Sequence, residues 1–147
     1  MTKTIDRTLD HALFFARRLQ DCDPICVILL VLIELRFETH KDGFGYLKHS
    51  IDRYFQEPGH LTKDIYPSVA EMYSTDITSL QMDTAIRSVI EDAWKRRDDE
   101  MWSYYFPPDQ NGKNHKPSNA EFISRIAVFV ELWRGCCKGE RVCLKTE

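Results

Sequence analysis

A helix predicted over about residues 79–97 has two unlike faces, and its polar face carries the side chains best placed for recognition chemistry. Helical spacing of apolar residues indicates that the other face packs against a core. The apolar residues are Met82, Ala85, Ile86, Val89, Ile90, Ala93 and Trp94. The polar residues are Gln81, Asp83, Thr84, Arg87, Ser88, Glu91 and Lys95. Hydrogen-bonding groups of this length can read the edges of DNA bases, so this face predicts a surface for double-stranded DNA.

A shorter helix precedes this one and is separated from it by a polar elbow at residues 74–76. We expect the shorter helix to begin with Thr62 as its cap and to bury an apolar face. That face consists of Ile65, Val69, Met72 and Tyr73. Two helices joined by a tight turn form a helix-turn-helix, whose second helix enters the major groove. The predicted base-reading residues are Gln81, Asp83, Thr84, Arg87 and Ser88.

Cations near these helices are candidates for contacts with the DNA backbone. Ser118 and Glu121 have the spacing of a capping box, and the free amides of a helix start can bind a phosphate. The predicted backbone contacts are Lys63, Lys95, Lys113, Lys116 and Ser118. Other roles remain open, because Arg87 can pair with an acid four residues away and the run 95–97 suits a helix C-terminus.

Composition favours one globular, all-helical domain with an extension. The 147 residues are 43% hydrophobic and 29% charged, and alternating apolar and polar residues are nearly absent. We therefore predict an all-α fold, a compact bundle of about six or seven helices with no sheet. Expected helices cover 4–20, 25–37, 45–55, 62–73, 79–97, 99–105 and 118–133, with Gly135 ending the last one. The net charge of −3 weakens the attraction to phosphates.

Other kinds of chemistry find little support in the sequence. His11, His40, His49 and His60 have no carboxylate or cysteine partner at catalytic or ligand spacing, and no nucleophile motif or phosphate loop occurs. We therefore predict no enzyme activity, cofactor or small-molecule substrate. The five cysteines favour buried or free thiols over a zinc site or a disulfide. The longest apolar run, 25–33, is too short to cross a membrane, so a cytoplasmic protein is expected.

Several separated blocks resemble one known family, in the order and spacing of that family. They are GYL at 45–47, LTKDIYPSVA at 61–70, AIR at 85–87, EDAW at 91–94 and KPSNAEFI at 116–123. Over roughly residues 27–134 the chain is similar to the C-terminal DNA-binding effector domain of the master sporulation response regulator, the stage 0 sporulation protein A family of endospore-forming bacteria. The resemblance implies a compact helical domain that binds short promoter elements, often as head-to-tail neighbours on tandem sites.

The sequence departs from the family pattern in two places. The residues before the matching blocks read as helices, so the receiver domain that precedes the effector domain in the family is not predicted here. The family typically carries a Glu-Arg pair where this chain has Asp83 and Thr84. Loss of a bidentate arginine removes roughly 1–3 kcal/mol of base discrimination. This loss implies a different target sequence or weaker DNA reading.

We expect an N-terminal helical extension over residues 1–23, a helix-turn-helix domain over 24–135 and a mobile tail over 136–147. The first hypothesis is a sequence-specific transcriptional regulator that places the helix at 79–97 in the major groove. The second is a non-enzymatic protein-interaction module that keeps the fold but has lost strong DNA binding. It is favoured by the acidic charge, by Thr84 and by the apolar segment 25–37, which could form a homodimer through the N-terminal helices or bind a response regulator.

Overall fold

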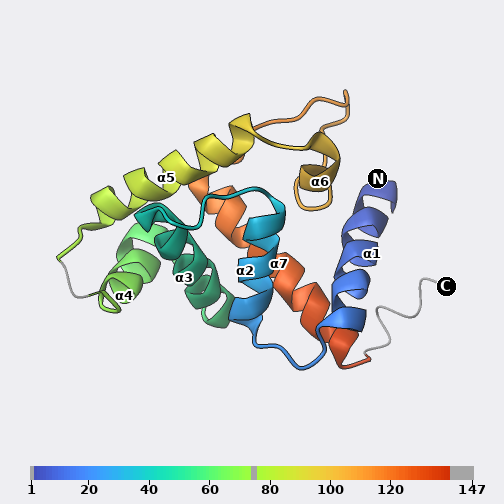
Figure 1. Ribbon diagram of the computed structural model, residues 1–147, viewed down its shortest axis with the longest axis horizontal. Helices are drawn as coiled ribbons and strands as arrows, with labels where there is room; N and C mark the ends of the chain where they lie inside the picture. The colour runs from blue at the N-terminus through green and yellow to red at the C-terminus, as the bar shows by residue number, and fades with distance from the viewer. Residues whose placement is uncertain (1, 74–75, 140–147) are drawn as a thin grey trace.

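The computed structural model describes residues 2–73 and 76–139, and over these residues its architecture is purely helical (Figure 1). These residues form seven α-helices and one π-helical turn, with no strand, which confirms the predicted all-α fold. The elements are α1 (Thr2–Arg18), α2 (Pro24–Glu34), α3 (Asp42–Gln56), η1 (Leu61–Ile65), α4 (Tyr66–Ala70), α5 (Ser79–Lys95), α6 (Asp99–Ser103) and α7 (Asn119–Cys137).

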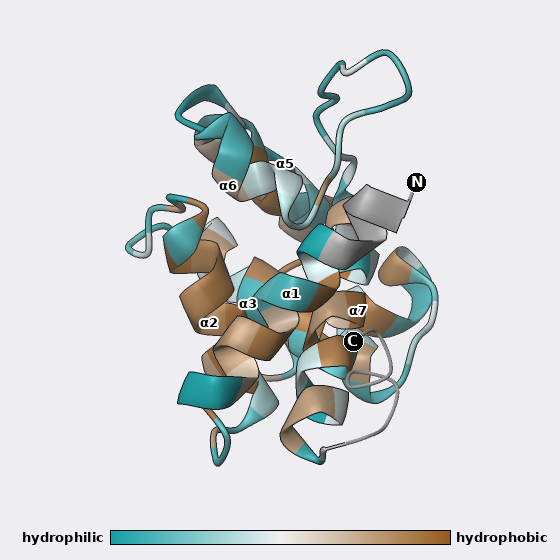
Figure 2. Ribbon diagram, turned by 90° about the vertical axis from the view of Figure 1, so that its right-hand side faces the viewer, coloured by the Kyte–Doolittle hydropathy of each residue, from teal (hydrophilic) through white to brown (hydrophobic). Residues whose placement is uncertain are grey.

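The core is built around α7, which runs through the molecule beneath α5 and is packed by α1 on one side and α3 on the other (Figure 1). Its inward residues Phe122, Ile126, Phe129 and Val130 are essentially inaccessible to solvent. α2 is apolar nearly all round, as its colour shows in Figure 2, and it packs against both α3 and α7. Its packing against these two helices accounts for the long apolar run in this segment.

α2 ends at Glu34, three residues before the predicted end at Phe37. Arg36 adopts a left-handed backbone conformation with φ of 71°, which stops the helix. The amide of Phe37 then donates to the carbonyl of Leu32 at 3.0 Å. This closing turn folds Phe37 back into the core, where its side chain is only 5% exposed.

The segment predicted as one helix from Thr62 to Tyr73 is instead a π-helical turn followed by a short helix. The amide of Ile65 donates to the carbonyl of His60 at 3.0 Å, so the turn is wide and Thr62 lies inside it instead of capping it. Pro67 has no amide to continue an ordinary ladder, which is compatible with a widened turn before it. Met72 was predicted to be buried but is 60% exposed, because α4 ends at Ala70.

α3 begins at Asp42, earlier than predicted, and takes in residues that the sequence suggested were a polar connector. A Cβ on Gly43 would lie 2.4 Å from the carbonyl oxygen of Ala85, so this glycine permits α3 and α5 to approach closely. At the other end of the chain α7 continues past Gly135 to Cys137. The left-handed glycine that follows the helix is Gly139, with φ of 69°.

Candidate nucleic-acid interface

The outer face of α5 is open to solvent, as the sequence predicted. Gln81, Thr84, Arg87 and Ser88 are all exposed. The opposite face is buried as expected through Met82, Ile86, Val89, Ile90 and Ala93. In Figure 1 α5 lies along one edge of the molecule, with α3, α4 and α7 on its inner side and α1 farther away. α1 therefore leaves this face accessible.

The start of α5 is defined by a capping box that the sequence analysis did not identify. The hydroxyl of Thr78 accepts from the amide of Gln81, and the Gln81 side-chain oxygen accepts from the amide of Thr78 at 3.0 Å. Ser79 donates its hydroxyl to the carbonyl of Thr62 at 3.1 Å, which joins α5 to the π-helical turn. These bonds set where the helix begins and hold part of the Gln81 side chain.

Asp83 is placed differently from its neighbours on the predicted reading face, because its side chain is only 22% exposed. Its Oδ1 atom accepts from the Tyr66 hydroxyl at 2.8 Å and from Nδ2 of Asn119 at 2.9 Å. Its Oδ2 atom accepts from Nη2 of Arg87 at 2.6 Å. Burial, followed by the bond to Asp83, raises the pKa of the Tyr66 hydroxyl well above its usual range, so the hydroxyl stays a donor.

Arg87 therefore pairs with Asp83, one of the two acids that its helical spacing allowed. Its side chain remains 54% exposed, so the guanidinium also faces solvent. The second acid, Glu91, accepts instead from the ammonium of Lys116 at 2.9 Å. This hydrogen bond lowers the pKa of the Glu91 carboxyl below its ordinary value.

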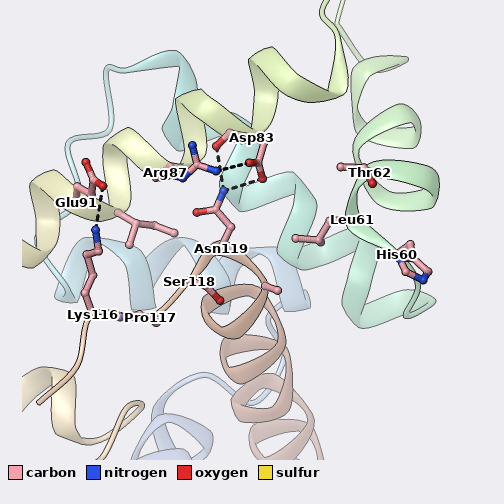
Figure 3. Close-up of a pocket in the computed structure, with 12 residues that line it drawn as sticks. His60, Leu61, Thr62, Asp83, Arg87, Glu91, Lys116, Pro117, Ser118 and Asn119 are labelled. Carbon is pink, nitrogen blue, oxygen red and sulfur yellow. Dashed lines mark hydrogen bonds and ion pairs between the residues drawn. The ribbon is translucent and has the colours of Figure 1, made fainter.

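These side chains surround a groove of about 450 Å³ between η1, α5 and the start of α7. Figure 3 shows Asp83, Arg87 and Glu91 descending from α5 toward Lys116 and Asn119, while His60, Leu61 and Thr62 form the far wall. Charged and amide groups line one side of the groove, and the apolar residues Leu61, Ile90 and Pro117 also contribute to its lining. Both cations that line the groove, Arg87 and Lys116, are paired with a carboxylate.

The predicted backbone-contacting residues do not form one cluster. Lys116 and Ser118 line the groove with Arg87, and Ser118 forms the predicted capping box with Glu121. Lys63 lies on η1 and lines a separate hollow with residues such as Arg53 and Glu71. Lys95 and Lys113 are exposed on the last turn of α5 and on the loop before α7.

The cationic run at 95–97 is largely engaged within the protein. Arg96 donates to the carbonyl of Arg36 at 2.6 Å. The Arg97 guanidinium lies 3.8 Å from the centre of the Trp94 ring and pairs with Asp99 at 2.7 Å. Lys95 and Arg96 are exposed, and Arg97 is partly buried. The run therefore stabilises the end of α5 and its packing, and only part of its positive charge is available to a ligand.

Sequence reasoning missed Asn119 and Tyr66, which complete the arrangement at Asp83. Asn119 is buried, with 8% exposure, and its amide also donates to the backbone carbonyl of Asp83 at 2.9 Å. Both residues belong to sequence blocks that carry the family resemblance. For Asn119, the signal in the sequence was a polar residue directly after the capping Ser118. No local spacing relates Asn119 to a residue 36 positions earlier.

Two expectations away from the interface were wrong. Nε2 of His11 lies 3.1 Å from Oε1 of Glu34, a carboxylate partner that the spacing had not suggested. Glu34 also accepts from the Tyr105 hydroxyl, so this cluster joins α1, α2 and the segment after α6. Cys136 is disulfide-bonded although no disulfide was expected, whereas Cys22, Cys26 and Cys137 are free thiols, as expected.

Within the described part of the chain, no group of three or more His, Cys, Asp or Glu residues is arranged to hold a metal ion. Among the same residues, no helix combines the length and apolarity that a membrane crossing requires. The first residues of the predicted tail belong to α7, which continues to Cys137. Residues 140–147 and residues 74–75 lie outside the described structure, so the rest of the predicted tail and most of the predicted elbow are not placed.

Residues 28–130 match the family model described as "Sporulation initiation factor Spo0A C terminal". The matched region begins within α2 and ends within α7, so it includes the π-helical turn, α5 and every residue around the groove. α1 lies before it.

Proposed function

The chain belongs to the family of C-terminal domains of sporulation initiation factor Spo0A, and we propose that it recognises specific DNA sequences by placing α5 in the major groove. The family is one of DNA-binding regulatory domains and not of enzymes. The observation that carries the proposal is the exposed outer face of α5, on which Arg87 is held by Asp83.

The dimensions of α5 suit this role. Its 17 residues span about 25 Å at 1.5 Å per residue, and a helix with side chains is about 10–12 Å wide. The major groove of B-DNA is about 12 Å wide and admits one such helix. The exposed groups of Gln81, Thr84, Arg87 and Ser88 then meet base edges, with Arg87 best suited to guanine because it offers several donors.

Backbone contacts come from residues that flank this helix. Lys116 and the start of α7 stand beside the groove, where the ammonium and the helix amides can meet one phosphate. Lys63, Lys95 and Lys113 supply further charges around α5. Because Glu91 already pairs with Lys116, a phosphate must replace this carboxylate as the partner of the ammonium. We therefore expect modest affinity with a shallow dependence on salt.

The decisive experiment uses the whole protein and a random pool of duplexes, followed by titration of the selected duplex by fluorescence anisotropy. Arg87→Ala should weaken binding by about 5- to 150-fold, the equivalent of 1–3 kcal/mol. Arg17→Ala is the matched control, because Arg17 is an exposed helical arginine on α1, far from α5. Equal affinities of the two variants for the duplex would show that Arg87 on α5 does not contact the DNA.

A second candidate function rests on apolar side chains of the N-terminal helices. Phe14, Leu30 and Ile33 are 46%, 39% and 48% exposed, and they suit a homodimer contact. The apolar surface that α2 offers is limited, because its residues Val27, Ile28, Val31 and Leu32 are buried within the chain itself. Light scattering over a range of concentrations tests this proposal, and Ile33→Glu should shift any dimer toward monomer. A monomer at every concentration would refute it.

A further inference from the structure

Most acceptor positions of the Asp83 carboxylate are already used by hydrogen bonds within the protein. Its Oδ1 atom receives two donors, from Tyr66 on α4 and from Asn119 on α7. Its Oδ2 atom receives the guanidinium of Arg87, one turn later on α5. Asn119 adds a bond to the Asp83 backbone carbonyl. Three helices thus converge on one carboxylate, whose directions for accepting hydrogen bonds are mostly used inside the protein.

The bond to Arg87 orders a long side chain before any ligand arrives. An arginine held in one geometry loses less rotamer entropy on binding than a free one, and this preorganisation favours affinity and specificity. Only Nη2 is engaged by Asp83, and the guanidinium has five N–H donors in total. Most of its donors therefore remain for a base or a phosphate, consistent with its 54% exposure.

We infer that Asp83 is a positioning residue: it ties α4, α5 and α7 together and orients Arg87 for DNA, and it does not itself read a base. This inference rests on the proposed function, because it concerns the same face of α5. It also reassigns one of the five residues predicted to contact bases. The specificity of the site then depends on Arg87, and Asp83 acts through it.

The substitution Asp83→Asn separates the bonds that join the three helices from the bond that orients Arg87. The amide oxygen can still accept from Tyr66 and Asn119, which keeps the contacts among the three helices. The amide nitrogen replaces Oδ2 and presents a donor to the Arg87 guanidinium, so that bond is lost. Tyr66→Phe is the matched control, because it removes a different donor to Asp83 and leaves the bond to Arg87 intact.

The test is a double-variant cycle on the duplex selected by the wild type, with melting temperatures measured in parallel. We expect Asp83→Asn to weaken binding about tenfold and to relax preference at the base pair that Arg87→Ala affects. In the Arg87→Ala background it should change affinity by less than about twofold. Tyr66→Phe should keep the affinity within about threefold of wild type, even where the melting temperature falls.

Each other outcome overturns the inference in a recognisable way. Additive losses would mean that Asp83 reads a base independently of Arg87. Tighter binding by Asp83→Asn would mean that the carboxylate competes with DNA for Arg87. A loss in Tyr66→Phe as large as in Asp83→Asn would assign the effect to the fold. Failure of the wild type to select any duplex would refute the proposed function, and the inference with it.

Discussion

The close approach of α3 and α5 at Gly43 yields the sharpest stability prediction. An added Cβ would lie 2.4 Å from the carbonyl oxygen of Ala85 and 2.9 Å from Cγ1 of Val89. An ordinary contact needs about 3.5 Å, so the two helices must separate by roughly 1 Å at this point. The obstacle is backbone in the middle of α5, which cannot rotate away as a side chain can.

Gly43→Ala should therefore destabilise the protein. Overpacking of this kind lowers the free energy of unfolding by about 3 kcal/mol, and the higher helix propensity of alanine offsets at most about 1 kcal/mol of this loss. The net loss is about 2 kcal/mol, which corresponds to a fall of about 4–8 °C in melting temperature for a chain of this size. Urea denaturation followed by circular dichroism measures the free energy of unfolding directly.

Gly45→Ala provides the control within the same helix. Its Cβ would meet only the hydroxyl of Tyr73 at 2.9 Å, the far end of a side chain that can rotate. The gain in helix propensity is the same, so we expect stability equal to wild type or higher by up to about 1 kcal/mol. If Gly43→Ala proved as stable as Gly45→Ala, the proposed helix crossing would be wrong.

Two further predictions concern histidines. His11→Ala should destabilise the protein by roughly 2–4 kcal/mol, because it removes a mostly buried ring and one partner of the Glu34 carboxylate. Amide hydrogen exchange should then become faster in α1. Unchanged exchange in α1 would contradict this role. Burial lowers the pKa of His49 below its usual value of about 6.5, so the unfolded chain takes up the proton first as the pH falls. Stability should therefore decline from about pH 6.5 downward, and His49→Gln should lose less melting temperature than wild type between about pH 7.5 and 5.5.

Several features were predictable because they depend on neighbouring residues. The buried stripe of α5 repeats every three or four residues, and the Ser118–Glu121 capping box closes within one turn. Both patterns are consequences of helix geometry and need no knowledge of the partner element. The all-helical class and the open polar face of α5 follow from the same local periodicity.

Other features depended on contacts between distant residues. The early end of α2 at Glu34, followed by the left-handed Arg36, and the wide turn before Pro67 are backbone conformations that the spacing of apolar residues does not predict. The capping box at Thr78 is local, but the polar run at residues 74–76 indicated a turn earlier in the chain, so no cap was predicted at Thr78. Met72 continued the apolar spacing of its segment, yet the helix stopped before it and left the side chain exposed.

By itself, the sequence determined which elements are helices, which side of α5 is apolar and which family the chain resembles. Only the tertiary structure decided what Asp83 does, because its partners come from α4 and α7 and meet it through the packing of three helices. It likewise brought His11 to Glu34 across 23 positions. Helical periodicity extends over a few residues, whereas hydrogen-bond partners so far apart depend on crossing angles and close approaches that the whole core determines together.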